Sequence, residues 1–151
     1  MSDRSELIEL HNRLSKTLDE ERGAAREKRY EKGYRTAREN LDDLVDKDSF
    51  VEYGQLAIAA QKSRRELEEL RTETAADGII TGFGKINSEI LDDKKALSAI
   101  IINDYSVLAG TQGYYHHKKL DRICETAEKQ NLPVVMYTEG GGGRPGDTDV
   151  H

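Results

Sequence analysis

The chain of 151 residues is long enough for one domain with a buried core, but its composition narrows the kinds of protein it can be. Hydrophobic residues make up 36% and charged residues 34%, and the formal net charge of −6 leaves no basic surface for duplex nucleic acid. The single cysteine, Cys124, excludes an internal disulfide and a cysteine zinc cluster. Because the sequence has no signal-peptide pattern and no membrane-spanning segment, we expect a cytoplasmic protein without nucleic-acid or membrane partners.

The amino-terminal segment carries a narrow apolar stripe. Its leucines recur at steps of three or four residues, which predicts an amphipathic helix (Leu7, Leu10, Leu14 and Leu18). Residues 20–35, "EERGAAREKRYEKGYR", are charged on all sides and contain two glycines. Such a stretch buries little on its own, so it fits a linker, a frayed helix or a surface docked on another chain. We interpret residues 1–35 as a charged helical extension, followed by one domain over 36–151.

The next elements have local signals. Thr36 followed by Glu39 fits a capping box and predicts a helix that begins there. Turn-forming residues at 46–49 end this pattern, and "FVEY" at 50–53 alternates as a half-buried strand does. Residues 61–74 return to a charged helical pattern.

From Gly78 onward the chain becomes more apolar. "GIITGFGKINSEI" predicts a strand pair that turns near Asn87, and "ALSAIIINDYSVLAG" predicts a continuous buried strand followed by a loop. A helix after Gly113 is expected to bury one face, including the Cys124 thiol (Leu120, Ile123, Cys124 and Ala127). "LPVVMYT" predicts a further short buried strand. This part of the chain is predicted to contain a strand, a glycine loop, a helix, a second strand and a second glycine loop. Such a succession indicates an α/β fold with parallel strands.

Two glycine-rich loops follow the predicted strands, at Leu108–Gly113 and Glu139–Gly143. Glycine lets the backbone adopt positive φ and approach a ligand closely, and free N–H groups in such a loop can bind an anion. A flexible connector is the alternative. A phosphate-binding P-loop is excluded because Asp147 stands where the lysine is required, and a dinucleotide fingerprint is excluded because Pro145 replaces its third glycine. An oxyanion hole built from backbone N–H groups remains.

Several blocks in order resemble the carboxyltransferase subunit or domain of biotin-dependent acyl-CoA carboxylases, of the acetyl-, propionyl- and methylcrotonyl-CoA type. "TARENLDDLVDKDSFVEYGQLA" resembles the opening helix, turn and strand of that family, and "ADGIITGFGKIN" resembles its G-D-G-V-V-T-G-x-G segment. "NDYSVLAGTQGYYHHKKLDRI" and "LPVVMYTEGGGGRPGD" resemble its two glycine-loop blocks. The similarity runs from about Gly33 to the end of the chain.

The resemblance implies an α/β fold of the crotonase-like (ClpP/crotonase) spiral type, present here in part. It also implies an enzyme that moves a carboxyl group from carboxybiotin, held on a carrier domain, to the α-carbon of an acyl-CoA. The implied partners are acyl-CoA, biotin carboxylase and biotin carboxyl carrier subunits or domains, and further copies in a homo-oligomer. Most of the family's length is missing, so we expect this chain alone to be an inactive amino-terminal fragment.

Carried over residue by residue, the family's oxyanion pair falls on Gly141 and Gly142. Glu139 and Gly140 replace the family's Asp-Ser, so the register of the donors stays open by one residue. The substrate-binding candidates are the neighbouring loop positions, the matched arginine and a histidine (Gly110, Thr111, Gly140, Gly143, Arg144 and His116). Metal ligands are not expected. The alternative function is a non-catalytic helical assembly module with a flexible glycine connector.

Overall fold

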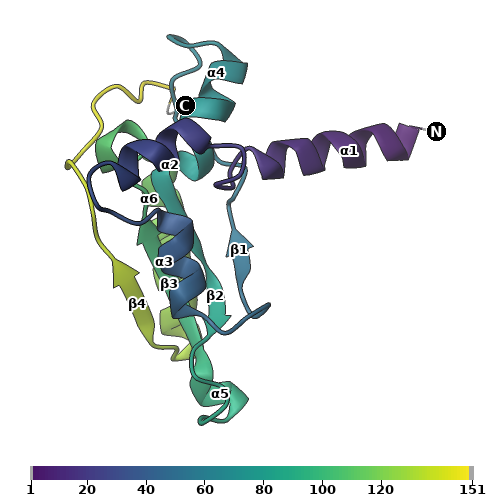
Figure 1. Cartoon of the computed structure of the whole chain (residues 1–151), viewed down its shortest axis with the longest axis vertical. Coiled ribbons are helices and arrows are strands. Elements are labelled where there is room, and N and C mark those ends of the chain that lie inside the picture. The colour runs from purple at the N-terminus through teal and green to yellow at the C-terminus, as the bar shows by residue number, and fades with distance from the viewer. Residues whose placement is uncertain (1, 150–151) are drawn as a thin grey trace.

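The computed structural model describes residues 2–149 of the chain (Figure 1). Its helices and strands follow one another as α1 (Ser2–Ser15), α2 (Gly23–Tyr30), α3 (Ala37–Leu44), β1 (Val51–Tyr53), α4 (Leu67–Glu73), η1 (Ala75–Gly78), β2 (Ile79–Lys85), α5 (Asp93–Ala96), β3 (Leu97–Asn103), η2 (Leu108–Gly110), α6 (Tyr114–Gln130) and β4 (Val134–Tyr137). None of the described helices is long and apolar enough to cross a membrane.

A four-stranded sheet in the order β1-β2-β3-β4 forms the centre of the fold. Strands β1, β2 and β3 pair antiparallel, whereas β3 and β4 are parallel and joined by α6. Helix α3 covers one face of the sheet and α6 covers the other (Figure 1). Because β3 and β4 run in the same direction, the two glycine loops leave the sheet at the carboxyl ends of these strands, where α/β folds bind ligands.

Two local predictions are confirmed in detail. The side chain of Thr36 accepts a hydrogen bond from the Glu39 amide, and the Glu39 carboxylate accepts one from the Thr36 amide, so α3 begins with a complete capping box. Strand β3 is buried on both faces, as its continuous apolar run predicts: Ile100 and Ile102 belong to the core beneath α3, and Ile101 to the core beneath α6.

Three predictions from the apolar pattern need correction. The partner of β2 is β3, while the residues after Asn87 form a turn and α5, with Ile90 81% exposed. Strand β4 was expected to be buried, yet it is the sheet edge, and Val134 is 47% exposed. Cys124 is exposed. The buried face of α6 is formed instead by His116, Lys119, Ile123 and Ala127, which share one side of the helix at helical spacing.

Residues 2–35, the described part of the charged extension, contain two helices with different surroundings. Helix α1 is present as predicted, but it projects away from the sheet (Figure 1), and Leu7 and Leu10 of its stripe are 50% and 40% exposed. Helix α2, in the segment that fitted a linker or a surface for another chain, is folded against its own chain. Its contacts reach the second glycine loop.

Candidate active site

The two glycine loops contact each other backbone to backbone. A Cβ atom on Gly110 would lie 2.5 Å from the carbonyl oxygen of Glu139, and one on Gly140 would lie 2.6 Å from the carbonyl oxygen of Gly110. Gly110 also has a φ of +66°. Side chains are therefore excluded at these two positions by the close approach of the loops, which is a structural reason for both glycines.

Two hydrogen bonds hold the loops in register beyond this contact. The Gln112 amide donates to the Gly142 carbonyl at 2.8 Å, and the Arg144 amide donates to the Gln112 carbonyl at 2.8 Å, which forms a parallel bridge between Gln112 and Gly143. The second loop is thus attached to the first and is not a free connector within this structure.

The middle of the glycine run has open backbone donors. Gly140 to Gly143 are exposed, and within residues 2–149 their N–H groups donate to no other group. Gly142 has a φ of +86°, with no atom within 4 Å of a Cβ position. Gly141 is bounded more tightly, because its Cβ position lies 3.1 Å from the Ala109 carbonyl oxygen and 3.2 Å from Thr111 Cγ2. Adjacent unpaired amides beside a fixed wall can stabilise a developing oxyanion.

Arg144, expected to bind substrate, is committed to the protein itself. Its guanidinium contacts the Asp77 carboxylate and donates to the Thr111 carbonyl at 2.6 Å and to Thr111 Oγ1 at 3.2 Å. The side chain is only 5% exposed, and Asp77 is fully buried. We therefore reassign Arg144 as a residue that fixes the end of the glycine loop, because its donors face inward.

The same ion pair also caps helix α6. Asp77 Oδ2 accepts a hydrogen bond from the His116 amide at 2.8 Å, and Asp147 Oδ2 accepts one from the Tyr114 amide at 2.8 Å. Asp147 also lies 3.5 Å from the Arg144 guanidinium. The amino end of α6 begins at Gly113, which has no side chain to cap it. Two carboxylates distant in sequence therefore occupy this end, which is consequently closed to a substrate anion.

Asp77 reaches this position through a strained turn. Ala76 and Asp77 have φ values of 53° and 50°, and Gly78 continues the left-handed conformation with a φ of 74°. Lys119 Nζ donates to the Ala76 carbonyl at 2.8 Å and compensates for part of the strain. Burial raises the pKa of the Asp77 carboxyl, and the adjacent Arg144 guanidinium offsets only part of this rise.

His116, one of the substrate-binding candidates, is fully buried. Its Nδ1 lies 3.2 Å from the Asp77 carbonyl oxygen, and its Nε2 has no hydrogen-bond partner among the described residues. Burial lowers the pKa of the imidazole from 6.5 to about 4, so the ring is neutral at pH 7. A fully buried ring does not reach a substrate outside the fold, so the predicted substrate contact is wrong and His116 belongs to the core beneath α6.

The buried imidazole predicts acid sensitivity. Between pH 6.5 and about 4 the unfolded chain binds a proton at His116 and the folded chain does not, so stability falls as the pH falls through this window. We expect a loss on the order of 3 kcal/mol by pH 4, and a smaller loss in His116→Leu. Urea unfolding at pH 7 and pH 4.5 measures it, with the exposed His117→Leu as control. Equal acid sensitivity in wild type and His116→Leu would contradict this origin.

A second, half-buried ion pair fixes the beginning of the glycine loop. Arg29 of α2, only 8% exposed, forms two hydrogen bonds with the Glu139 carboxylate, at 2.7 and 2.8 Å. Its guanidinium also donates to the Arg35 carbonyl and lies 5.0 Å from the ring centroid of Tyr34. Sequence reasoning missed Arg29, because nothing in the charged run of 20–35 distinguishes it from the other basic residues.

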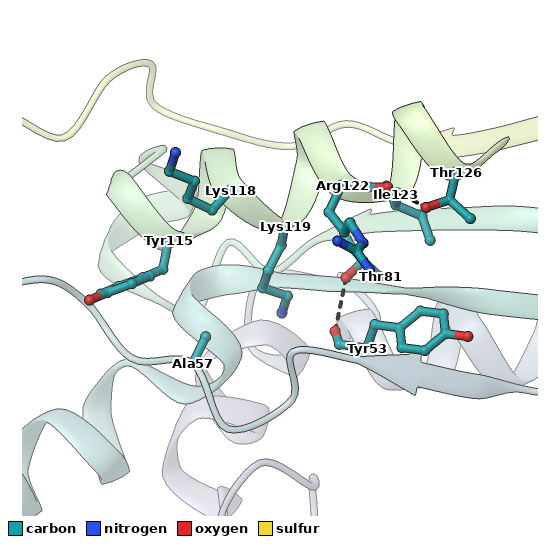
Figure 2. A pocket seen from close by; sticks show the side chains of 9 residues that line it. All are labelled: Tyr53, Ala57, Thr81, Tyr115, Lys118, Lys119, Arg122, Ile123 and Thr126. Atoms are coloured by element: carbon teal, nitrogen blue, oxygen red, sulfur yellow. Dashed lines mark hydrogen bonds between the residues drawn. The ribbon is translucent and has the colours of Figure 1, made fainter. Parts of the chain in front are cut away.

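The described residues contain cavities on different sides of the sheet. Figure 2 shows one of about 320 Å³ between α6 and strands β1 and β2, lined by Tyr53, Tyr115 and three basic residues (Lys118, Lys119 and Arg122). No residue of the glycine run lines it. Another, of about 470 Å³, lies at the ends of β3 and β4 and includes Asn103, Thr138 and Glu139. The second cavity therefore adjoins the glycine loop, and the first does not.

Comparison with known proteins identifies the family. The model of the carboxyl transferase domain family matches residues 28–148. The chain belongs to the carboxyl transferase family. It is 34% identical over 139 residues to the biotin-dependent acetyl-/propionyl-coenzyme A carboxylase beta5 subunit of Mycobacterium leprae (strain TN), covering 91% of this chain and 23% of that protein. It is 30% identical to the propionyl-CoA carboxylase beta chain of Roseobacter denitrificans (strain ATCC 33942 / OCh 114), covering 84% and 24%.

Solved structures agree with this placement in the carboxyl transferase family. A single-chain, multi-domain long-chain acyl-CoA carboxylase is 51% identical, with a TM-score of 0.91 over 94% of this chain and 14% of that one. The transcarboxylase 12S hexamer with bound methylmalonyl-coenzyme A is 27% identical, with a TM-score of 0.66 over 82% and 22%. The fold is crotonase-like, represented in part, and the chain spans about a quarter or less of the length of these relatives.

Proposed function

We propose that this carboxyl transferase chain forms the acyl-CoA side of a biotin-dependent carboxyltransferase active site. Its amides at Gly141 and Gly142 donate hydrogen bonds to the thioester oxygen when the α-carbon is deprotonated and enolate charge develops there. The observation that carries the proposal is a run of exposed, unpaired N–H groups held between the ion pairs Arg29–Glu139 and Asp77–Arg144. Donors fixed before the reaction stabilise charge without reorganisation.

The remaining loop residues have separate roles in this proposal. Gly110 and Gly140 permit the close contact between the loops, and Thr111 contributes its methyl group to the wall beside Gly141. Gly143 continues the exposed backbone at the Gln112 bridge. The chain's own residues thus bind and polarise the thioester, while carboxybiotin on a carrier domain supplies the carboxyl group. Biotin carboxylase, the carrier and further copies of the carboxyltransferase are proposed partners, and we propose that the chain alone does not turn over.

Binding by the chain can be measured directly. Titration of the ¹⁵N-labelled chain with acetyl-, propionyl- and longer acyl-CoA thioesters is expected to shift the amide signals of Gly141 and Gly142. A series of chain lengths also shows which acyl group binds best. The corresponding free carboxylic acids, which have no thioester, are the matched ligands expected to leave these signals unchanged.

An assembly role is the second candidate, favoured by the exposed stripe of α1. Ile8 is 57% exposed beside Leu7 and Leu10, so this helix presents several large apolar side chains to water, and exposed apolar patches mark interaction sites. If CoA thioesters leave the glycine amides unmoved, while deletion of residues 2–15 lowers the mass measured by sedimentation, the assembly role replaces the catalytic one.

A further inference from the structure

Lys119 of helix α6 is a lysine whose charged end lies inside the fold. It is 8% exposed, and its side chain points from α6 toward the sheet, along the cavity shown in Figure 2. Gly54 makes room for it, because a Cβ atom on Gly54 would lie 3.0 Å from three carbons of the lysine side chain. Within residues 2–149 the ammonium group forms no ion pair and binds backbone carbonyls instead. A buried cation without a countercharge is costly, so its position calls for a reason.

The two carbonyls that Lys119 binds lie at the two ends of a left-handed turn. Its Nζ donates to the Ala76 carbonyl at 2.8 Å and also to the Ile79 carbonyl. Ala76, Asp77 and Gly78 have φ values of 53°, 50° and 74°. Residues other than glycine adopt this conformation at a cost, so the turn needs support from outside itself. Lys119 supplies that support by binding the beginning and the end of the turn with one cation.

This turn determines where the Asp77 carboxylate lies. One of its oxygens contacts the Arg144 guanidinium, and the other accepts a hydrogen bond from the His116 amide at 2.8 Å. Arg144 in turn donates to the Thr111 carbonyl at 2.6 Å and fixes the end of the glycine loop. A continuous series of hydrogen bonds therefore leads from Lys119 to the glycine run, and such contiguous networks can couple distant positions.

We propose that Lys119 is a positioning residue for the carboxyl transferase reaction: its ammonium group holds the turn at 76–79 and, through Asp77 and Arg144, the geometry of the glycine run. This inference rests on the proposed function, because that geometry matters for transfer only if the glycine amides bind the thioester oxygen. Lys119 acts through other residues, so loss of its ammonium group is expected to misplace the amides of Gly141 and Gly142 without removing a substrate contact.

The protonation of Lys119 gives this role a dependence on pH. Burial lowers the pKa of its ammonium group from 10.5 to about 8; the carboxylates of Glu52 and Asp77 oppose this shift, and the Arg38 guanidinium adds to it. An ammonium group forms charge-assisted hydrogen bonds to the two carbonyls, whereas the amine present above pH 8 forms weaker ones. The turn and the glycine run are therefore expected to change together near pH 8. The other ionisable groups around the side chain lie on β1 and α6 (Tyr53, Tyr115, His116, Lys118 and Arg122).

The first test follows the complete chain by ¹³C NMR between pH 6.5 and pH 9.5. The Cε signal of Lys119 reports its own protonation, and the backbone carbonyl signals of Asp77 and Gly141 report the turn and the glycine run. In the wild type all three are expected to share one midpoint near pH 8. Lys119→Met keeps a long unbranched side chain without N–H donors, and its Asp77 and Gly141 signals are expected to lose this step. Lys118→Met, at the exposed neighbouring position, is the matched control and is expected to keep it.

The second test measures transfer in the assembled carboxylase. At pH 7, Lys119→Met is expected to lower single-turnover carboxyl transfer at least about tenfold, because small misplacements of the groups that act on a substrate cost rate steeply. Its affinity for acyl-CoA is expected to stay within about threefold of the wild type, a split that a general loss of folding would not produce. Lys118→Met is expected to change neither quantity.

Transfer in Lys119→Met equal to that of the wild type would overturn the inference, and so would a Gly141 signal that does not follow the Lys119 titration. The wild-type titration needs no variant, so it remains decisive if methionine prevents folding. Glycine signals that respond to a thioester but not to the protonation of Lys119 would overturn this inference alone. Glycine signals that follow Lys119 but respond to no thioester would overturn the proposed function alone.

Discussion

Gly142→Val is expected to lower carboxyl transfer by about 10²–10³-fold in the assembled carboxylase while leaving the affinity for acyl-CoA nearly unchanged. Gly142 has a φ of +86°, which a β-branched side chain strongly disfavours, so the valine peptide unit rotates and its N–H leaves the thioester oxygen. No atom lies within 4 Å of a Cβ there, so the effect arises from backbone conformation and not from a clash. Single-turnover transfer and equilibrium binding separate the two quantities.

Gly23→Ala is the control for this substitution. Gly23 begins α2 and, like Gly142, has no atom within 4 Å of its Cβ position, but its φ is not positive. Alanine there is expected to leave transfer unchanged and to stabilise the helix by about 0.5–1 kcal/mol. Wild-type transfer in Gly142→Val would remove the oxyanion assignment. Equal losses of binding and rate would assign the loop to substrate binding in general, with no preference for the transition state.

The glycines of the two loops are present for different physical reasons. Gly110 and Gly140 are required by the protein, since each Cβ would lie within 2.6 Å of a carbonyl oxygen of the other loop. At Gly142 the positive φ favours glycine. At Gly143 neither a close contact nor a positive φ requires glycine. Gly141 and Gly142 are therefore the proposed oxyanion donors, because both have exposed, unpaired N–H groups. Only Gly141 has a wall beside it, formed by the Ala109 carbonyl and the Thr111 methyl group.

Sequence reasoning succeeded where the determining interactions are local. The capping box between Thr36 and Glu39 spans three residues, and the apolar run of β3 marks a strand buried on both faces without reference to its neighbours. The family resemblance likewise rests on short blocks. The fold class and the position of the glycine loop could therefore be predicted from the sequence.

The ion pairs that support the loop could not be predicted from the sequence, because their partners are far apart along the chain. Arg29 and Glu139 are 110 residues apart, and Asp77 and Arg144 are 67 apart. In the sequence both arginines resemble other basic residues, and only the fold places a carboxylate opposite each buried guanidinium. The predicted substrate contact of His116 was wrong for a related reason. Its position at the start of a charged helix does not reveal that its amide donates to Asp77, 39 residues away, or that its ring is buried.

Asp77→Asn is expected to destabilise the chain by about 3–5 kcal/mol, because it leaves the buried Arg144 guanidinium without its countercharge. Asparagine keeps the size of Asp77 and tolerates its positive φ, so the change tests charge and not shape. The exposed pair Arg35–Asp43 offers the control: Asp43→Asn is expected to cost at most about 1 kcal/mol. Urea unfolding measures both.

The double variant Asp77→Asn/Arg144→Met decides whether the loss comes from an uncompensated charge. Methionine fills part of the arginine volume without charge, so the double variant is expected to recover most of the stability lost in Asp77→Asn. Its glycine amides should nevertheless respond less to acyl-CoA, since Arg144 no longer ties the loop end to Thr111. Stability that returns while the response to acyl-CoA stays lost would separate the two effects of this ion pair, on folding and on the geometry of the loop. A double variant no more stable than Asp77→Asn would instead mean that the carboxylate acts mainly through its cap on α6.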